Sequence, residues 1–250
     1  MLTSLSQPLI FAHRGASAHA PENTLAAFEL ALAQHADAIE LDVKLSADGH
    51  AVVIHDATVD RTTGSQGRVK DLSLAQLKSL DAGSFFSEKY RGERIPTLEE
   101  VFEAVGKRTF INVELTNYNA PRDQLVETVC ILVKKFALQE RVIFSSFFAS
   151  NLSKARTFLP EVPRGLLALN GWLGAWARSF GFAFGRYHAL HPYLSDVTPQ
   201  HVQRVHRLKR RVHVWTVNRA EDMRRLFHWS VDGIFTDDPQ LAVQVRSESK

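Results

Sequence analysis

Ionisable side chains gather at four short apolar runs that have the composition of buried strands. In chain order these runs carry His13-Arg14, Glu40 with Asp42, His55-Asp56, and Asn112 with Glu114. Residues two apart on a strand share a face, so the paired polar groups point the same way. In parallel α/β proteins, catalytic groups collect at the carboxyl ends of the strands. The spacing therefore predicts one site built from several strands.

Three carboxylates, from Glu40, Asp42 and Glu114, would meet at that edge. They would repel one another strongly unless a cation lay among them. The ligand atoms are all oxygens, and the chain's one cysteine, Cys130, belongs to no zinc-ligand pattern. We therefore expect one hard divalent cation, Mg²⁺ or Ca²⁺, with Mn²⁺ also compatible. The alternative is that each carboxylate pairs with an arginine or lysine.

Two histidines, His13 and His55, would flank the same carboxylates. Near neutral pH one imidazole can be a base while the other is an acid. Arg14 offers a planar fork that suits a phosphate oxygen. A metal, an arginine and an acid–base pair together suit phosphoryl transfer. A histidine at a strand end can also be only structural, and that is our interpretation of the other nine.

Short β-branched runs alternate with helical patterns, which is typical of a parallel sheet with crossover helices. We expect strands at 9–13, 38–43, 51–55, 109–115, 142–146, 165–169, 189–193, 212–217 and 233–236. We expect helices near 24–34, 73–80, 97–105, 122–136, 149–158, 198–208 and 220–229. Thr97 and Thr198-Pro199 are typical helix starts.

The second and third predicted strands are separated by a short turn containing Ala47-Asp48-Gly49. A parallel crossover needs about a dozen residues, so these two strands should form an antiparallel hairpin. Setting 51–55 aside leaves eight strands. We expect a (β/α)8 TIM barrel with a small insertion after the second strand, at about 45–95, as a single catalytic domain over 1–250. A doubly wound open sheet is the alternative fold.

The amino-acid composition is that of a globular protein and excludes several other classes. Hydrophobic residues make up 45% and charged residues 23% of the 250, which excludes disorder and coiled coil. A net charge of +3 does not indicate nucleic-acid binding, and the basic cluster at 204–211 lacks interleaved aromatic residues. The sequence shows neither a signal-peptide pattern nor an apolar run of about 18 residues. We expect a cytoplasmic protein with no stable membrane insertion.

The ordered motifs resemble the glycerophosphodiester phosphodiesterase family of the cytosolic type, a metal-dependent barrel family. The matching segments are 12–15 (AHRG), 21–24 (PENT), 39–43 (IELDV), 47–49, 53–56 (VIHD), 60–63 (DRTT), 95–100 (IPTLEE), 113–115 (VEL), 215–218 (WTVN) and 232–237 (DGIFTD). They extend from residue 12 to about 239, nearly the whole chain. One motif alone would be a weak signal, whereas the ordered set is specific.

The resemblance implies a role for each matching residue. Glu40, Asp42 and Glu114 would bind the metal, and His13 and His55 would be the acid–base pair. Arg14 would bind the phosphate. Trp215 would form a wall against the glycerol moiety, and Glu22 would anchor the neighbouring loop. The implied reaction is metal-dependent hydrolysis of glycerophosphodiesters, such as glycerophosphocholine or glycerophosphoethanolamine. The glycerol 2-hydroxyl would attack phosphorus, and water would open the resulting cyclic phosphate to give sn-glycerol 3-phosphate. Asn23 or Thr24 has a simpler interpretation as a helix cap.

This chain departs from the family pattern at Thr116, where many members have lysine two residues after the glutamate. Lys44, in step with Glu40 and Asp42, either replaces that cation or faces solvent. We expect weaker phosphate binding or a shifted substrate range. Thr116 also favours a non-catalytic barrel that binds phosphorylated ligands, although the intact histidines and carboxylates oppose it.

The segment 171–187 is rich in tryptophan and phenylalanine. We expect it to be a helix and loop that pack on the barrel core or on a second copy of the chain in a homodimer. The alternative is an apolar lip for an acyl chain or a membrane surface. That lip would favour a lysophospholipase D-type enzyme acting on lipid phosphodiesters.

Overall fold

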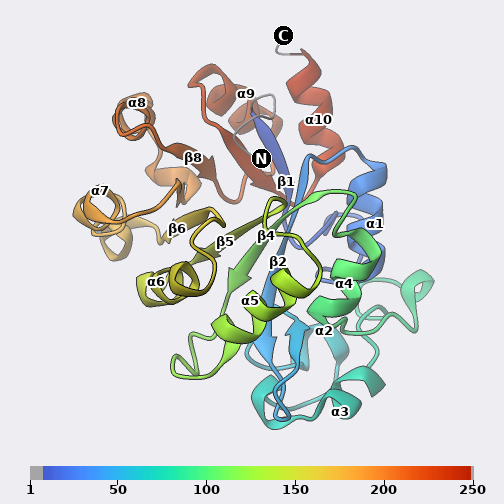
Figure 1. Cartoon of the computed structure of the whole chain (residues 1–250). Helices are drawn as coiled ribbons and strands as arrows, with labels where there is room; N and C mark the ends of the chain where they lie inside the picture. Colours follow the sequence, from blue (N-terminus) through green and yellow to red (C-terminus); the bar gives the residue numbers. More distant parts are fainter. Residues whose placement is uncertain (1–7, 249–250) are drawn as a thin grey trace.

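Eight parallel strands close into a barrel in the computed structural model, which describes residues 8–248 (Figure 1). The strands are β1 (Leu9–Ala12), β2 (Ala38–Leu45), β4 (Phe110–Leu115), β5 (Val142–Ser146), β6 (Arg164–Ala168), β7 (Ala189–Pro192), β8 (Arg211–Val214) and β9 (Gly233–Thr236). β1 pairs in parallel with both β2 and β9, which closes the barrel. The TIM barrel is confirmed, and the doubly wound open sheet is wrong because this sheet has no free edge at β1.

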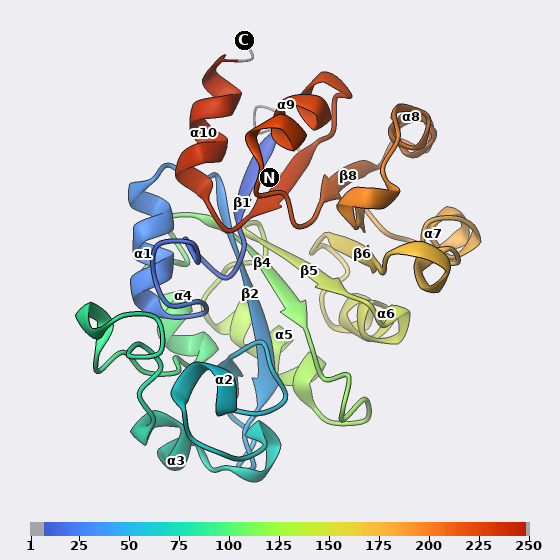
Figure 2. The same ribbon diagram turned by 180° about the vertical axis from the view of Figure 1, so that it is seen from behind.

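The ninth strand, β3 (Ala51–Val53), lies antiparallel to the end of β2, as the short turn predicts. The insertion that follows contains α2 (Asp60–Thr63), η2 (Val69–Asp71), α3 (Leu74–Ser79) and η3 (Glu88–Tyr90). It has a small apolar core of its own, centred on Val52, Val59 and Leu77. In Figures 1 and 2 this cyan region lies beyond the arrowhead of β2, at the carboxyl end of the barrel.

Helices cover the outside of the barrel (Figures 1 and 2). They are α1 (Leu25–Ala33), α4 (Leu98–Val105), α5 (Leu125–Lys135), α6 (Ala149–Phe158), α7 (Phe180–Phe184), α8 (Pro199–Arg207), α9 (Ala220–His228) and α10 (Pro239–Glu248), with short turns η4 (Gly171–Gly174) and η5 (Leu194–Asp196). Thr24, Thr97 and Thr198 cap their helices by accepting a backbone N–H. The seven predicted helices are confirmed within a few residues, and α7 lies in the segment 171–187, where a helix and loop were expected; α2 and α10 were not predicted.

Two apolar layers meet at the strands, and the inner one positions the site. The larger layer lies between strands and helices and includes Ile39, Leu41 and Val43. The inner layer contains Phe11 and Ala38. Because alternate residues of a strand share a face, the positions that follow on the same inner faces are the polar groups of β2 and the residue after β1. The barrel interior is therefore apolar at its base and ionisable at its carboxyl end.

Candidate active site

The predicted carboxylate cluster forms at the carboxyl ends of β2 and β4. Glu40, Asp42 and Glu114 each offer an oxygen, and these three oxygens lie within 4.8 Å of one another. Asp42 and Glu114 are direct partners in the strand register. Glu40 and Asp42 are only 3% and 2% exposed. Oxygen donors at this spacing fit a hard divalent cation.

Burial and mutual repulsion set the electrostatics of this cluster. Burial raises the pKa of Glu40 well above its ordinary value, and the charges of Asp42 and Glu114 raise it further. Burial, followed by the charge of Asp42, raises the pKa of Glu114 to about 8. Burial also opposes ionisation of Asp42, but Arg14 and His55 keep the pKa of Asp42 below its ordinary value. Full ionisation of all three carboxylates near pH 7 therefore requires a further positive charge.

The loop after β1 places the guanidinium group of Arg14 at the edge of this cluster. The backbone N–H of Arg14 donates to Glu40 Oε2 at 3.0 Å, and its guanidinium Nε lies 3.4 Å from Asp42 Oδ2. Arg14 has a left-handed backbone (φ 56°). Its Nη1 donates to Glu22 Oε1 at 3.0 Å, so Glu22 lies beside the site and contacts Arg14. Asn23 Nδ2 donates to Asp42 Oδ2 at 3.0 Å, so Asn23 supports a carboxylate, while Thr24 caps the helix.

Each of the two predicted histidines is held by an aspartate. His13 Nδ1 lies 2.6 Å from Asp237 Oδ1, and His55 Nδ1 lies 2.6 Å from Asp56 Oδ1. These contacts fix the orientation of both rings and direct Nε2 to a ligand. Asp237 also accepts a hydrogen bond from Asn218. Both aspartates lie in the quoted motifs, yet sequence reasoning assigned neither a role.

Arg61, in the insertion, links the two halves of the site. Its Nη1 and Nη2 donate to the two carboxylate oxygens of Glu22 at 2.7 Å, and its Nε donates to Asp56 Oδ2 at 2.7 Å. Burial opposes ionisation of Asp56, but hydrogen bonds from Arg61 and His55 lower the pKa of Asp56 to about 2. Side chains that are far apart in the sequence thus form a continuous ion-paired chain from Arg14 to His55. Sequence reasoning missed Arg61.

A cavity of about 70 Å³ brings the predicted groups together. Its lining includes His13, Arg14, Glu40, His55, Glu114 and Trp215. Asp42 and Glu22 lie behind it and contact Arg14. The indole Nε1 of Trp215 donates to the His191 carbonyl at 2.7 Å, and the ring packs edge-on against Phe147 and Tyr193. Trp215 is therefore an apolar wall held in one orientation.

Lys44 does not simply face solvent. Its Nζ donates to the carbonyl and the Oγ1 of Thr116, at 3.1 and 2.8 Å. Burial lowers the pKa of Lys44, whereas the charges of Asp42 and Glu114 raise it. The ammonium group of Lys44 therefore lies beside Thr116, close to Asp42 and Glu114.

The segment 171–187 is largely unpacked. Its exposed apolar side chains are Trp172, Leu173, Trp176, Phe180 and Phe184, whereas Phe182 is buried. Trp172 is 95% and Phe184 84% exposed. The expectation that this segment packs on the barrel core is wrong for these five residues. The segment follows the carboxyl end of β6, at the same end of the barrel as the cavity.

The basic cluster at 204–211 lies away from the cavity that holds the histidines. Arg204 and Arg207 are exposed on α8, and the chain then enters β8 at its amino end. Within residues 8–248, no helix is long and apolar enough to cross a membrane.

Comparison with known proteins gives one consistent family. A sequence model of the glycerophosphoryl diester phosphodiesterase family matches residues 13–241. The chain is 42% identical over 238 residues to a glycerophosphodiester phosphodiesterase of Caldanaerobacter subterraneus, covering 95% of this chain and 97% of the relative. It is 37% identical to a glycerophosphodiester phosphodiesterase of Bacillus altitudinis, covering 96% and 99%.

A solved structure agrees with the sequence relatives. An Oleispira antarctica phosphodiesterase, in complex with the product sn-glycerol-3-phosphate, superposes with a TM-score of 0.89 at 32% identity. The match covers 96% of this chain and 97% of that one. A putative glycerophosphoryl diester phosphodiesterase from Silicibacter pomeroyi has a TM-score of 0.86 at 28% identity, covering 96% and 93%.

Proposed function

Because this chain belongs to the glycerophosphoryl diester phosphodiesterase family, we propose that it hydrolyses glycerophosphodiesters such as glycerophosphocholine or glycerophosphoethanolamine to sn-glycerol 3-phosphate and an alcohol. The observation that carries the proposal is one cavity in which a carboxylate cluster lies between two histidine–aspartate pairs. The family consists of enzymes, so the non-catalytic barrel is set aside. A cytoplasmic location, and one domain over 1–250, stay predictions from the sequence.

The donor set fits one divalent cation, and we assign its ligands to Glu40, Asp42 and Glu114. All three offer oxygens, and their shared negative charge requires compensation within the barrel. Mg²⁺ and Ca²⁺ suit such ligands best, and Mn²⁺ is compatible. When bound, a cation of this kind neutralises phosphate charge and activates a neighbouring hydroxyl group.

The side chains around the cluster bind and orient the substrate. Arg14, held by Glu22 and Asp42, offers its guanidinium to a phosphate oxygen. Trp215 packs against the glycerol moiety and excludes water from that side. Both histidines line the same cavity, so each reaches the substrate from a different strand end.

Proton transfer then follows from the two histidines. One Nε2 takes the proton of the glycerol 2-hydroxyl as its oxygen bonds to phosphorus. The bond from phosphorus to the alcohol oxygen breaks, and the other histidine gives that oxygen a proton, which leaves a cyclic phosphate and the free alcohol. Water opens the ring with the two roles exchanged and yields sn-glycerol 3-phosphate. Asp237 and Asp56 hold the rings so that the same nitrogens act in both steps.

The proposal is tested by measuring release of sn-glycerol 3-phosphate from glycerophosphocholine and glycerophosphoethanolamine. The assay uses Mg²⁺, Mn²⁺, Ca²⁺ or EDTA, with the His13→Ala variant in parallel. We expect turnover with a divalent cation, none in EDTA, and a loss of about 10²–10⁴-fold in the variant. Turnover that is unaffected by EDTA or by His13→Ala would contradict it.

One observation favours a second candidate function. Two exposed indoles, Trp172 and Trp176, lie in the segment that follows the carboxyl end of β6, where they suit contact with an aggregated lipid. A lysophospholipase D-type reaction would use the same cavity and release choline from lysophosphatidylcholine. Choline release from lysophosphatidylcholine faster than from glycerophosphocholine would favour this candidate.

A further inference from the structure

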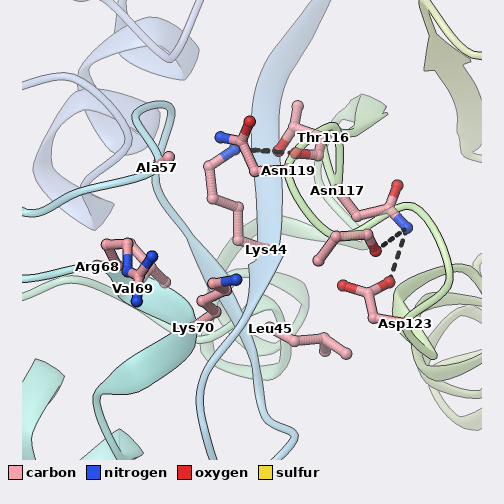
Figure 3. Close-up of a pocket in the computed structure, with 11 residues that line it drawn as sticks. Lys44, Leu45, Ala57, Arg68, Val69, Lys70, Thr116, Asn117, Asn119 and Asp123 are labelled. Atoms are coloured by element: carbon pink, nitrogen blue, oxygen red, sulfur yellow. Dashed lines mark hydrogen bonds between the residues drawn. The ribbon is translucent and has the colours of Figure 1, made fainter.

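A second cavity, of about 290 Å³, lies at the carboxyl ends of β2 and β4 (Figure 3). We call it the alcohol cavity, and its polar lining consists of Lys44, Arg68, Lys70, Asn117, Asn119 and Asp123, together with Thr116. These residues come from β2, from the insertion and from the loop between β4 and α5. The cavity is larger than the one that holds the histidines.

Lys44 connects the alcohol cavity to the carboxylate cluster. It follows Asp42 by two residues on the same strand face, and its ammonium binds Thr116, which follows Glu114 by two residues. The charges of Asp42 and Glu114 act directly on that ammonium. Lys44 also lines the cavity, as Figure 3 shows. A ligand with its phosphate at the cluster therefore reaches the cavity by passing Lys44.

The position of the cavity in the barrel assigns it to one half of the substrate. Trp215 directly follows β8. In the closed ring of eight strands, β8 lies four strands from β4 in either direction, which is directly across the barrel. Trp215 therefore lies across the barrel from the alcohol cavity, whereas the carboxylate cluster lies on β2 and β4, the strands that lead into that cavity. The two ester arms of a phosphodiester diverge from phosphorus. With the glycerol arm against Trp215, the other arm, the alcohol, extends to the alcohol cavity.

The charges of the cavity select the kind of alcohol. Asp123, its only carboxylate, already accepts hydrogen bonds from Asn117 Nδ2 at 2.7 Å and from the Leu125 backbone. Arg68 pairs with Asp71 in an exposed contact. Lys44 binds only neutral oxygens, and among residues 8–248 no ion pair involves Lys70. With Arg68 paired to Asp71, the ammonium groups of Lys44 and Lys70 outnumber the one lining carboxylate, Asp123, and leave the lining of the cavity with a net positive charge.

From this geometry we infer that the alcohol cavity binds the leaving alcohol and prefers one that carries a negative charge, such as a phosphorylated polyol. Asn117 and Asn119 supply amide groups for its hydroxyls. A cationic alcohol such as choline meets repulsion from Lys70. The inference rests on the proposed hydrolysis of glycerophosphodiesters and adds the class of alcohol that the site prefers.

The test compares kcat/KM at low ionic strength for three substrates that differ in the charge of the alcohol. They are glycerophosphoinositol 4-phosphate, glycerophosphoinositol and glycerophosphocholine, each with excess divalent cation. We expect kcat/KM to fall in that order for the unaltered chain. Lys70→Glu should lower the value for the phosphorylated substrate about tenfold and raise the value for glycerophosphocholine, because the charge at the cavity changes by two units.

A matched control makes the same charge change elsewhere. Lys107 is exposed and precedes β4, at the opposite end of that strand from the cavity. Lys107→Glu should leave the order and the ratios of the three kcat/KM values unchanged. Lys70 is exposed on the short η2, so we expect the Lys70→Glu variant to fold. Lys70→Gln changes the charge by one unit and should give intermediate kcat/KM values. Thermal melting of both variants checks that they fold.

Two results would overturn the inference while leaving the proposed function intact. One is equal kcat/KM for all three substrates in the unaltered chain. The other is a Lys70→Glu variant that loses activity by the same factor on each. A chain that hydrolyses none of the three with any divalent cation would instead contradict the proposed function itself.

Discussion

At the scale of single residues, the site depends on side chains that never contact a substrate. The guanidinium of Arg61 binds Glu22 on one side and Asp56 on the other. Glu22 holds Arg14, and Asp56 holds His55. The proposed phosphate ligand and a proposed proton donor are therefore fixed relative to each other through one residue. Because small misplacements of such groups slow a reaction strongly, we assign Arg61 as a positioning residue.

Replacing Arg61 with methionine tests this role. We expect kcat to fall about tenfold or more and KM to change less, because His55 loses its fixed orientation while Arg14 keeps Asp42 as a partner. Arg61→Lys should recover part of the loss. Arg91, an exposed arginine of the same insertion that pairs with Glu88, provides the control as Arg91→Met. Unaltered kcat in Arg61→Met would show that the link is only structural.

A second prediction at this scale concerns the ammonium group beside Thr116, which Lys44 supplies from β2 and which a lysine at position 116 would supply from β4. Lys44→Met should lower kcat/KM for glycerophosphocholine about tenfold, because the ammonium beside Thr116 helps to balance the charge of the phosphodiester. The double variant Lys44→Met/Thr116→Lys should restore activity by supplying the ammonium from β4 instead of β2. Steady-state kinetics of both variants measure this. A double variant as slow as Lys44→Met would contradict the exchange.

The carboxylate cluster was predictable because strand geometry alone places Glu40 beside Asp42 on one face. The partners of the histidines were not. Asp237 lies 224 positions from His13, and only closure of the barrel between β1 and β9 brings the two together. The local sequence around Asp237 gives no sign of this contact, since Asp232-Gly233 in the same motif has only the pattern of a turn.

At the scale of elements, local pattern was sufficient for most strands and helices. The turn at Ala47-Asp48-Gly49 fixed the hairpin of β2 and β3, because too few residues separate the strands for a crossover. Pattern was insufficient for the segment 171–187. Its aromatic composition favours burial, but burial depends on whether another surface covers the segment. Only Phe182 among its phenylalanines is covered by this chain.

The exposed aromatic segment yields a prediction that separates lipid contact from catalysis. The variant Trp172→Ser/Trp176→Ser should hydrolyse glycerophosphocholine at an unaltered rate and bind lysophosphatidylcholine micelles several-fold more weakly. The reason is that two exposed indoles, which favour a membrane–water interface, are removed. Sedimentation with micelles and choline release measure the two effects.

The control for that experiment is Phe85→Ser, which removes a partly exposed aromatic ring from the insertion instead. It should leave micelle binding unaltered. Equal micelle binding by the double variant and the unaltered chain would contradict lipid contact. A change in sedimentation coefficient of the double variant without lipid would instead assign the segment to contact between two copies of the chain.

At the scale of the whole molecule, the barrel encloses three carboxylates that repel one another. Phe11 and Ala38 provide an apolar base, and above it lie the buried Glu40 and Asp42 and the partly buried Glu114. Burying like charges destabilises the folded state unless protons or a cation neutralise them. The stability of the molecule should therefore depend on pH and on divalent cation together.

The metal-free protein should lose stability as pH rises from about 7 to 8. Burial and neighbouring charges raise the pKa of Glu40 well above its ordinary value and that of Glu114 to about 8, so these two groups hold more protons in the folded state than in the unfolded state in this interval. Burial lowers the pKa of His191 and of His213, which has the opposite effect, but that effect is largely complete near pH 7, where the histidines of the unfolded chain have lost most of their protons. Asp42, whose pKa is lowered, contributes its own dependence only below its ordinary pKa, outside this interval.

A bound cation requires ionised ligands and binds only the folded chain, so it should stabilise more at pH 8 than at pH 7. We therefore expect Tm in EDTA to fall by a few degrees between pH 7 and 8, and Tm with Mg²⁺ or Ca²⁺ to fall less, since about 1 kcal/mol shifts Tm by roughly 2–4 °C at this size. Glu114→Gln should flatten the EDTA curve and reduce the gain from metal. A Tm in EDTA that stays constant from pH 7 to 8 would show that the three carboxylates do not repel one another in the folded protein.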